Sequence, residues 1–415
     1  MTTMTLGSVA QVYNGKTPSK LEHRACGHPV LKIKDISEVG QFKGQYSGFV
    51  NESFAARYRQ KWIAAGDTLI LNAAHNSDYV ASKAYLATDQ VAGSLPTGEW
   101  AVVRPDAAKL LPEYFYFWLR TDHTRKLLKF LVKGIHLYPK DVATLQVPVP
   151  PIAEQGRIVE LLSRAENIVR MRREAEKKAR EIIPALFLDM FGDLGMNSNG
   201  GDAAGPREHG DGRREANSVV RLGDVAEIAS GVAKGRKLVG KVIREVPYLR
   251  VANVQAGGLD LAEMKYIPAT ADEIAELAVR AGDVLLTEGG DFDKVGRGAL
   301  LEANIGECIH QNHVFRVRTH AHRVVPEYFA AYLQTSAARQ YFLKAAKKTS
   351  NLASINMTQL RNLPLSLPRL ETQRDFQERF RACRALERRQ SDATGIADVS
   401  FQSLLAGVFS ERQSI

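Results

Sequence analysis

Two long segments of this chain carry apolar residues at an alternating spacing of three and four. In the first, apolar positions fall at Ile158, Leu161 or Leu162, Ala165, Ile168 or Val169, Ala175, Ala179, Ile182 and Leu186. The second repeats the pattern more loosely, at Phe376, Phe380, Cys383, Leu386, Ile396, Leu404 and Leu405. This spacing is typical of a coiled-coil seam. It predicts spacer helices over 151–191 and 369–412. The expected seam or partner-binding residues are Leu161, Ile168, Leu186, Phe187, Phe380, Leu386 and Leu404.

Two residues interrupt these helical patterns. Pro184 lacks a backbone N–H and its ring clashes with the preceding turn, so we expect a kink or a short break late in the first helix. Gly395 has a low helix propensity, and we expect it to soften the second helix.

Shorter runs with strand character precede each long helix. Gly, Pro and Asn bound these runs, which predict strands in VLKIKDI (30–36), TLILNAA (68–74), EWAVVRP (99–105), VPYLRVANV (246–254), DVLLTEG (283–289) and HVFRVR (313–318). Helices are predicted at 112–132 and 326–347. The predicted fold class is therefore an α/β (α+β) domain, present in two copies at 1–150 and 218–368.

The order of these elements indicates a tandem duplication. The repeated strings are LGSVAQVYNG (6–15) with LGDVAEIASG (222–231), AAGDTLIL (64–71) with RAGDVLLT (280–287), and PEYFYFWL (112–119) with PEYFAAYL (326–333). Because the repeat is too long for a solenoid unit, each copy is a domain. Two similar domains tend to pack about a pseudo-two-fold axis, which would separate them by two antiparallel coiled-coil helices. The segment 192–217 is rich in Gly, Asn and charge and predicts a flexible linker.

Composition narrows the class of protein. The 415 residues are 45% hydrophobic and 25% charged, as in an ordinary globular protein. No run of apolar residues is long enough for a membrane span, and the N-terminus lacks the features of a signal peptide. Cys26, Cys308 and Cys383 are odd in number and scattered, which favours the reducing cytoplasm. A net charge of +10 and a pI of about 9.4 favour a polyanionic partner such as nucleic acid.

The sequence offers no catalytic or metal site. It lacks GxxxxGK followed by Ser or Thr, HExxH, GxSxG, a GxGxxG after a strand, and the aromatic tetrapeptide of amino-methyltransferases. His23, Cys26 and His28 have no fourth ligand at zinc-site spacing, so a polar loop is the favoured reading. Asp283 near Glu288 suggests a carboxylate pair. However, Asp283 recurs as Asp67 in the repeated Ala-Gly-Asp turn, which favours turn capping.

Basic and polar residues in loops, strands and helix ends are the candidate binding groups. Glycines let the backbone approach a phosphate, and lysines neutralise it. Arg can grip guanine and Asn can grip adenine from the major groove, although an ordinary solvated surface explains each single residue equally well. The candidate DNA-binding residues are Lys16, Thr17, Ser19, Lys32, Lys34, Lys133, His136, Lys234, Arg236, Lys237, Arg250, Asn253, Lys294, Arg297, Lys347, Lys348 and Asn351. They differ between the copies, as expected if each domain reads a different short sequence.

The chain resembles the specificity (S) subunit of type I restriction–modification systems. The resemblance covers nearly its whole length and rests on LGSVAQVYNGKTPS, GIHLYPKDVATLQVPVPPIAEQGRIVELL, LFLDMFGD, SLLAGVFSE, PYLRVANVQAGGLDL, LLTEGGDFDKVGRGAL and IHQNHVFRVR. It implies two target recognition domains that each read one part of a split site in double-stranded DNA, held at a fixed spacing by two helices. It also implies two methyltransferase subunits that methylate adenine N6 with S-adenosylmethionine. A restriction subunit that uses ATP and Mg²⁺ is an optional further partner. The chain itself would hold no catalytic residue and no cofactor.

Two other classes of function remain open at this point. One is a modification or nuclease enzyme that carries its own active site on this scaffold. The other is a scaffold that pairs proteins through its long helices and does not bind DNA.

Overall fold

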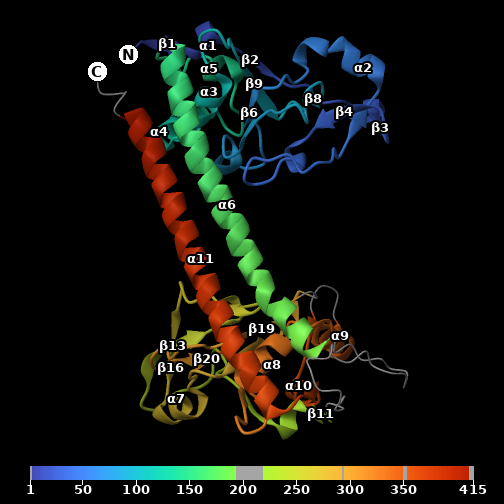
Figure 1. Ribbon diagram of the computed structural model, residues 1–415, viewed down its shortest axis with the longest axis vertical. Coiled ribbons are helices and arrows are strands. Elements are labelled where there is room, and N and C mark those ends of the chain that lie inside the picture. The colour runs from blue at the N-terminus through green and yellow to red at the C-terminus, as the bar shows by residue number, and fades with distance from the viewer. Residues whose placement is uncertain (1, 193–217, 292–293, 349–352, 411–415) are drawn as a thin grey trace. The chain divides into compact units, whose positions relative to one another are not determined.

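The computed structural model describes residues 2–192, 218–291, 294–348 and 353–410 (Figure 1). The chain divides into two compact units. Unit 1 comprises Met1–Glu174 and Asp392–Ile415, and unit 2 comprises Ala175–Ser391. The division falls inside the two long helices, so each unit holds one globular domain with part of both helices. Apart from Gly192, the segment in which the sequence predicts a flexible linker lies outside the described residues.

Unit 1 is built on two four-stranded sheets. Its strands are β1 Thr3–Thr5, β2 Ala10–Asn14, β3 His23–Arg24, β4 His28–Leu31, β5 Phe49–Val50, β6 Thr68–Leu71, β7 Ala84–Leu86, β8 Leu95–Pro96, β9 Trp100–Pro105 and β10 Gln146–Pro148. The central sheet has the order β2-β9-β6-β7 and is antiparallel throughout. The second sheet has the order β3-β5-β4-β8, in which β4 and β8 are parallel, and β1 pairs with β10.

Unit 2 repeats this plan. Its strands are β11 Ser218–Arg221, β12 Ala226–Ser230, β13 Arg244–Leu249, β14 Val254–Gln255, β15 Gly258–Leu259, β16 Lys265–Ala269, β17 Val284–Thr287, β18 Gly289–Gly290, β19 Gly298–Leu300, β20 Ile309–His310, β21 Val314–Thr319, β22 Lys347–Lys348, β23 Ala353–Ser354 and β24 Pro364–Leu367. The central sheet has the order β12-β21-β17-β19, a second sheet has the order β16-β13-β20 with β13 and β20 parallel, and β11 pairs with β24. The order of the pairs confirms the duplication that the sequence indicates.

Helices complete both units. The α-helices of unit 1 are α1 Leu6–Val9, α2 Glu52–Arg57, α3 Pro112–Leu119, α4 Asp122–Leu131 and α5 Pro139–Val142. Those of unit 2 are α7 Ala271–Leu277, α8 Pro326–Tyr332, α9 Ser336–Ala345 and α10 Met357–Arg361. The 3₁₀ turns are η1 Lys20–Glu22, η2 Ile33–Asp35, η3 Arg59–Lys61, η4 Ser77–Tyr79, η5 Leu222–Asp224 and η6 Val251–Asn253. The long helices are α6 Ile152–Phe191 and α11 Leu370–Ser410.

Two predicted single helices are each divided in two. The helix predicted over 112–132 is interrupted before Thr121, whose Oγ1 accepts a hydrogen bond from Thr124 N at 3.2 Å and starts α4. Thr335 does the same for α9 in unit 2, where Ala338 N donates at 3.3 Å. The prediction of uninterrupted helices was wrong, because a threonine N-cap starts a second helix within each predicted span.

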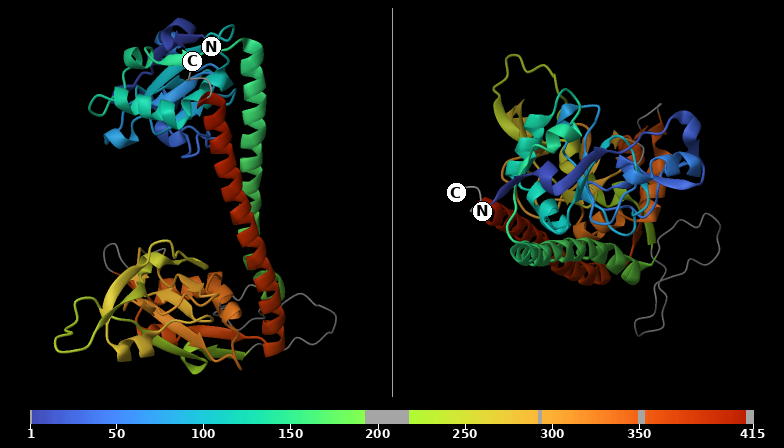
Figure 2. Two further views of the ribbon diagram at one scale, coloured as in Figure 1. Left: turned by 90° about the vertical axis from the view of Figure 1, so that its left-hand side faces the viewer. Right: turned by 90° about the horizontal axis from the view of Figure 1, so that it is seen from above.

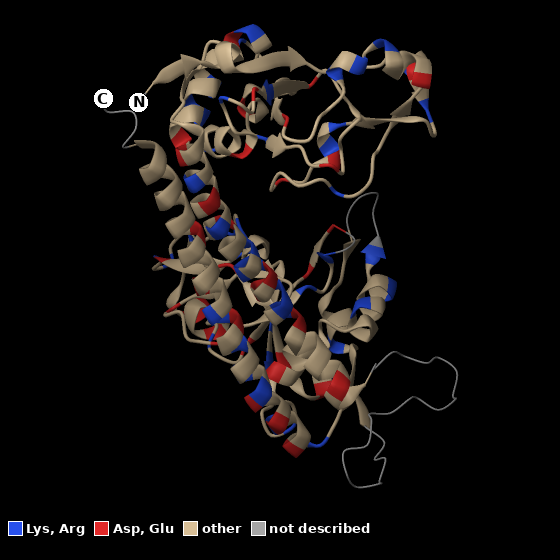
Figure 3. Ribbon diagram, turned by 45° about the horizontal axis from the view of Figure 1, so that its top comes forward, with Lys and Arg blue, Asp and Glu red and all other residues tan. Residues whose placement is uncertain are grey.

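The long helices run without a break through the two positions expected to interrupt them. The structure assigns α6 as one helix across Pro184 and α11 as one helix across Gly395. Ile183 and Phe187 are buried on either side of the proline, so tertiary packing holds this turn in place. Charged residues of both signs occur along both helices (Figure 3).

The two helices pack against each other in opposite directions (Figures 1 and 2). In unit 1 the early part of α6 shares a core with the end of α11, and Arg173 donates to Asp398 at 2.7 Å. In unit 2 the end of α6 shares a core with the start of α11, where the rings of Phe187 and Phe376 lie 5.6 Å apart. The predicted antiparallel arrangement is therefore confirmed.

The phase of the seam differs in part from the prediction. Phe187 and Phe380 are buried, and Leu186 and Leu404 pack at the edge of the cores. Leu161, Ile168 and Leu386 are exposed instead. The buried apolar positions on α6 are Ile158, Leu162, Val169, Ala179, Ile183, Phe187 and Phe191. Where the sequence offers two adjacent apolar residues, only one can face the core, because neighbours in a helix point about 100° apart.

Each long helix ends against the domain of the other copy. At the end of α6, the ring of Phe191 lies 5.0 Å from that of Tyr328 on α8. At the end of α11, the ring of Phe409 lies 5.4 Å from that of Tyr114 on α3. Tyr114 and Tyr328 occupy the same place in the repeated Pro-Glu-Tyr-Phe string, so the exchange is reciprocal.

A buried glutamine joins each domain to the start of its long helix. In α6, Gln155 is fully buried, accepts from Leu111 N at 2.8 Å, and donates to the carbonyls of Lys109 and Pro150, both at 2.8 Å. In α11, Gln373 accepts from Val325 N at 2.9 Å and donates to the carbonyls of Arg323 and Pro368. These three partners stand in unit 2 where Leu111, Lys109 and Pro150 stand in unit 1. Each amide therefore ties the long helix to the N-terminus of α3 or α8.

The phase of the seam makes a testable prediction about two adjacent leucines. Leu162 is 0% exposed and Leu161 is 47% exposed. Leu162→Ala should destabilise unit 1 by about 2–5 kcal/mol, because it leaves a cavity in the core. Leu161→Ala should change stability by less than about 0.5 kcal/mol, as expected of an exposed position.

All three tryptophans of the chain, Trp62, Trp100 and Trp118, lie in unit 1, so denaturant unfolding followed by tryptophan fluorescence reports on this unit. Equal effects of the two substitutions would contradict the packing described.

Candidate nucleic-acid interface

One end of the central sheet of unit 1 gathers several of the predicted binding residues. β2 ends at Asn14 opposite the start of β9, and β6 ends there too, with Leu71 paired to Trp100. The loop after β2 carries Lys16 and Thr17. We call this region the loop end of unit 1; it comprises Gly15–Thr17, Asn72–Tyr79, Pro96–Glu99 and Lys129–Tyr138.

Hydrogen bonds of the backbone and of one side chain connect these segments. Lys16 N donates to Pro96 O at 2.8 Å, and the hydroxyl of Thr17 accepts from Gly98 N at 3.1 Å. The turn that carries Lys133 and His136 is joined to the end of β6. Leu137 N donates to Asn72 O at 2.7 Å, and His136 forms an isolated antiparallel β-bridge with Ala73. The structure thus brings Lys16 and Thr17 to the same end of the sheet as Lys133 and His136.

Unit 2 has the equivalent loop end. β12 ends at Ser230 and β17 at Thr287, both opposite the start of β21. The small sheet β18-β23-β22 attaches here, since Ile355 N donates to Glu288 O at 2.9 Å. This sheet carries the backbone of Lys347 and Lys348, and Lys347 is exposed. Asn351 lies outside the described residues.

The glycines at the ends of β2 and β12 have a structural role. A Cβ on Gly15 would lie 2.1 Å from Thr97 O, and a Cβ on Gly231 would lie 1.9 Å from His310 O. Only glycine fits so close to neighbouring backbone. The sequence suggests that these glycines let the backbone approach a phosphate. In the structure they instead let two backbone segments of the same domain approach each other closely.

Lysines and hydroxyls of these loops remain accessible. Lys16 places its ammonium 5.2 Å from the centre of the Tyr58 ring, and Lys234 lies 5.9 Å from that of Tyr248. Thr17, Ser19 and Lys237 are exposed. Their positions on the surface are compatible with phosphate contact, which stays a prediction.

Arg236 has a structural role in unit 2. Its guanidinium donates to both carboxylate oxygens of Glu273, at 2.6 and 3.0 Å, and to Pro268 O at 2.7 Å. Hydrogen bonding to Arg236 lowers the pKa of Glu273 to about 2. Most of the guanidinium's donors are thus used to hold its loop against α7.

The strands predicted over 30–36 and 246–254 end early, so Lys32, Lys34, Arg250 and Asn253 do not lie in strands. β4 ends at Leu31 and β13 at Leu249, and a 3₁₀ turn follows each strand. Lys32 and Arg250 precede these turns, and Lys34 is exposed within the first.

Asn253 is buried and its side chain is used internally. Its oxygen accepts from Arg250 N at 2.9 Å, and its nitrogen donates to the carbonyls of Asp260 and Glu263. Arg250 itself lies 3.6 Å from the Glu263 carboxylate. Asn253, a candidate DNA-binding residue in the sequence, is therefore buried and used by the backbone turn.

The remaining candidates lie on the surface with acidic or polar neighbours. Lys133 forms an ion pair with Asp141 at 2.7 Å, and His136 is exposed. Lys294 is paired with Asp291, and Arg297 donates to the Gln255 side chain at 3.1 Å.

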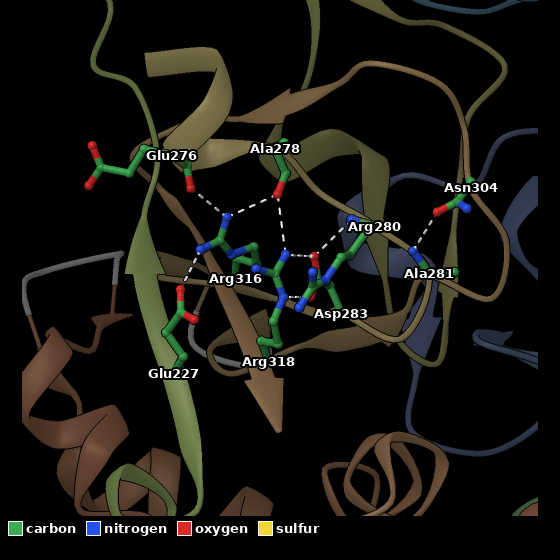
Figure 4. Close-up of polar contacts among 9 residues, drawn as sticks. All are labelled: Glu227, Glu276, Ala278, Arg280, Ala281, Asp283, Asn304, Arg316 and Arg318. Carbon is green, nitrogen blue, oxygen red and sulfur yellow. Dashed lines mark hydrogen bonds and ion pairs between the residues drawn. The ribbon is translucent and has the colours of Figure 1, made fainter. Parts of the chain in front are cut away.

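The repeated Ala-Gly-Asp turns are confirmed as capped turns. Asp67 accepts from Ala64 N at 2.8 Å and binds Arg104 through both oxygens at 2.6 and 2.7 Å. Asp283 accepts from Arg280 N and binds Arg318 in the same way (Figure 4). Hydrogen bonding to the aspartate raises the pKa of both arginines. Both carboxylates are buried, so this pairing belongs to the framework of the domains.

Unit 2 adds a second arginine beside this pair. Arg316 is buried on β21, at the place that Val102 occupies on β9 of unit 1. It donates to the carbonyls of Glu276 and Ala278 and to the Glu227 carboxylate at 2.8 Å (Figure 4). Burial lowers the pKa of Arg316. The two domains thus differ in their cores as well as on their surfaces.

His310, which lies at the loop end of unit 2, is also buried. Its Nδ1 lies 2.6 Å from Val314 O, and its Nε2 has no hydrogen-bond partner among the described residues. Burial lowers the pKa of His310 to about 4, so the folded domain holds a neutral ring.

The described residues offer no arrangement suited to a metal ion. No group of three or more His, Cys, Asp or Glu side chains in that part of the chain is placed to bind one. His28 stacks on Trp62 with ring centres 4.4 Å apart, and Cys26 is exposed. None of the described helices combines the length and apolar character needed to cross a bilayer.

Comparison with known families decides what these two domains are. A model of the type I restriction modification DNA specificity domain matches residues 1–179 and 215–392, one match for each copy. The chain belongs to this family. The two domains are therefore type I DNA specificity domains, as the resemblance implies.

Individual relatives agree with the family. Over 431 residues the chain is 22% identical to the type I restriction enzyme EcoBI specificity subunit of Escherichia coli, covering 98% of this chain and 85% of that one. It is 25% identical to a protein of Methanocaldococcus jannaschii named as a type I restriction enzyme MjaX specificity subunit, but this match covers only 38% of the chain and 37% of the relative. The match to the EcoKI specificity subunit of Escherichia coli K12 covers 59% of that relative.

The fold is shared with solved structures of these systems. A chain from work described as the structural basis of complex assembly and conformational transition of the type I R-M system matches with a TM-score of 0.58 and 17% identity. The match covers 98% of this chain and 97% of that one.

Four surface residues of the first specificity domain were not among the candidates predicted from the sequence. Tyr79, Phe130, Ile135 and Tyr138 are exposed beside the predicted cations of the loop end. Phe130 breaks the amphipathic pattern of α4, which is the one signal in the sequence that could have marked it.

His310 makes the stability of the second specificity domain depend on pH. Its folded pKa of about 4 lies below the usual value of 6.5, so the unfolded chain takes up a proton first as the pH falls. The contribution of the neutral His310 ring to the free energy of unfolding is fully present above about pH 6.5 and is lost as the pH falls toward 4. We expect a loss on the order of 3 kcal/mol over this interval.

The matched variant is His310→Asn, whose side-chain nitrogen can still donate to Val314 O but does not titrate. Hydrogen–deuterium exchange in unit 2, corrected for the intrinsic rate at each pH, should show a smaller loss of protection in this variant. If protection falls equally steeply with pH in the wild-type protein and the variant, His310 is not the group that makes the stability of unit 2 depend on pH.

Proposed function

We propose that this chain is the non-catalytic specificity subunit of a type I restriction–modification complex and that its two domains read the two halves of a bipartite site in double-stranded DNA. One observation carries this proposal. The two domains share sheet order, capped Asp turns and buried glutamines, but they present different side chains at the same loop end. A shared framework with different contact residues is what two unlike half-sites require.

The chemistry at each loop end supports contact with a duplex. Lys16, Thr17, Lys133 and His136 lie at one end of the sheet in unit 1, and Lys234 and Lys347 lie at the matching end in unit 2. Lysines there would neutralise phosphates and fix the register, while neighbouring side chains read base edges.

The long helices offer surface for partner subunits. Leu161 and Ile168 are exposed on α6 one heptad apart, and Ile396 and Val399 are exposed on α11. In unit 2, Ile182 and Leu386 are exposed on the same two helices. Apolar side chains in a row on a helix mark an interaction surface. We assign these faces to two methyltransferase subunits, which bring S-adenosylmethionine and methylate adenine N6. A restriction subunit that uses ATP and Mg²⁺ would join the same complex.

The division of labour between subunits can be tested directly. The purified chain with labelled S-adenosylmethionine and host DNA should transfer no methyl group, and addition of the methyltransferase subunits should restore transfer. DNA affinity should fall roughly 10³- to 10⁵-fold between 50 and 200 mM salt, as for proteins with six to ten phosphate contacts.

Two outcomes would refute this proposal. Methyl transfer by the chain alone would make it an enzyme in its own right. Absent or salt-insensitive DNA binding in the assembled complex would indicate a protein scaffold instead.

The helices should also act as a ruler between the half-sites. Four residues inserted into α6 within 175–179, together with four inserted into α11 near Asp392, lengthen both helices by about one turn, or 6 Å at 1.5 Å per residue. Mapping of methylated adenines should then show the unread gap longer by one or two base pairs.

An insertion in α6 alone is the matched control. Because α11 cannot follow it, we expect loss of activity rather than a new gap. An unchanged gap in the double insertion would mean that the helices do not set the spacing.

A further inference from the structure

The loop end of unit 1 carries an exposed apolar cluster that the function described so far does not use. Phe130 is 87% exposed near the end of α4, and Ile135 is 43% exposed at the tip of the next turn. Tyr79 and Tyr138 are exposed as well. We call these four residues the apolar tip. Large apolar side chains gathered on a surface generally mark a contact site.

The apolar tip is held in place by the framework of the domain. Lys129 Nζ donates to the carbonyls of Ser77 and Asp78, which fastens the turn of Tyr79 to α4 next to Phe130. Ile135 lies in a tight turn closed by a hydrogen bond of 2.8 Å from Lys133 N to His136 O. Gly134 in this turn has a φ of 62°, a conformation that glycine adopts without strain. These bonds hold the short turn in which Ile135 is exposed.

Cations surround the apolar tip. The segment 122–141 holds five Lys or Arg and two Asp, a formal charge of +3. Lys126 stands four residues before Phe130 on α4, so the two share one face of the helix. Lys133 and His136 flank Ile135 in the turn.

A duplex fits this surface better than a protein helix or a lipid. The positive charge complements phosphates, and the apolar tip lies at the same end of the sheet as the loop that carries Lys16. In the major groove of DNA, the 5-methyl group of thymine is the one apolar feature on a base edge that a side chain can touch.

The second domain differs at this place. Lys344 of α9 corresponds to Phe130 of α4, and it is exposed. The turn around Ile135 has its counterpart in β22 and β23, because Ser354 pairs with Lys347 and Gly289 as His136 pairs with Lys133 and Ala73. In this pairing Ala353, which is buried, stands where Ile135 stands in unit 1. The backbone pairing is therefore shared, while Phe130 and Ile135 differ from Lys344 and Ala353, as expected of residues that determine which sequence a domain reads.

We infer that Ile135 and Phe130 determine specificity in the half-site of unit 1 by contacting thymine methyl groups in the major groove. The inference rests on the proposed function, because it places a base contact at one of the two recognition domains. Lys126, Lys133 and His136 would hold the neighbouring phosphates.

Thymine can be changed to 2′-deoxyuridine, which removes only the methyl group. The experiment uses the complex of the chain with its methyltransferase subunits. Residues 1–150 are first exchanged for another recognition domain, and the half of the methylated site that changes is the half-site read by unit 1. Each thymine of that half-site is then replaced in turn. For at least one position, wild-type affinity should fall about fourfold, the value expected for one buried methylene-sized group.

Variants separate base contact from phosphate contact. Ile135→Ala or Phe130→Ala should weaken binding to the thymine duplex and remove the difference between thymine and deoxyuridine at that position. Lys126→Ala should weaken binding to both duplexes equally and reduce the salt dependence. Val39→Ala, an exposed apolar residue of unit 1 outside the loop end, should change neither. Tryptophan fluorescence on unfolding should confirm that all variants remain folded.

The outcomes distinguish this inference from the proposed function. A complex that methylates a bipartite site but binds thymine and deoxyuridine duplexes equally, or whose first half-site holds no thymine on either strand, overturns the inference alone. Loss of methyltransferase subunits in the Ile135→Ala or Phe130→Ala variants would show a protein contact and would also overturn it. Failure of the wild-type complex to bind DNA would instead remove the proposed function.

Discussion

The architecture depends on a buried hydrogen-bonded joint between each domain and its long helix. Gln155 and Gln373 are withdrawn from water, and each amide satisfies one backbone N–H and two carbonyls that no secondary structure would otherwise pair. An unpaired buried polar group costs about 1–3 kcal/mol, so loss of the amide would expose several such groups at once. The chain enters the helix through prolines, and the glutamine fixes the direction in which it leaves. Phe191 and Phe409 then fasten the far ends of the helices, which makes each unit a closed structure of one domain and two helix segments.

The duplicated framework and the differing surface have separate physical origins. In the capped turns, the buried carboxylates of Asp67 and Asp283 pair with the half-buried Arg104 and Arg318, and removal of either arginine would leave a buried charge uncompensated. Such features constrain both copies to the same backbone. The loop ends carry no comparable constraint. There the first domain presents an aromatic and aliphatic tip among lysines, whereas the second presents lysines, so one scaffold can serve two different readings of DNA.

Several basic residues that look like ligand contacts are structural. Arg236 is committed to Glu273 and a carbonyl, and Asn253 is committed to its own turn. Lys16 and Lys234 differ in this respect, because their ammonium groups lie 5.2 and 5.9 Å from aromatic ring centres, while Lys16 is half-buried and Lys234 is exposed. The residues best suited to phosphate contact in this fold are therefore the loop lysines, and the arginines serve mainly to hold the loops.

The sequence by itself determined the duplication, the two long helices, the strands β6, β9, β17 and β21 of the central sheets, and the capping role of Asp67 and Asp283. Each of these depends on periodicity or on residues close together in the chain. Only the tertiary structure decided that Leu162 rather than Leu161 faces the core, that Thr121 and Thr335 restart their helices, and that Phe130 stays in solvent. These outcomes depend on partners far away in the sequence, such as Phe401 and Leu405 packing against the early part of α6. A local pattern defines an apolar face only to within one residue, and the contacts made by the folded chain select among the choices it leaves.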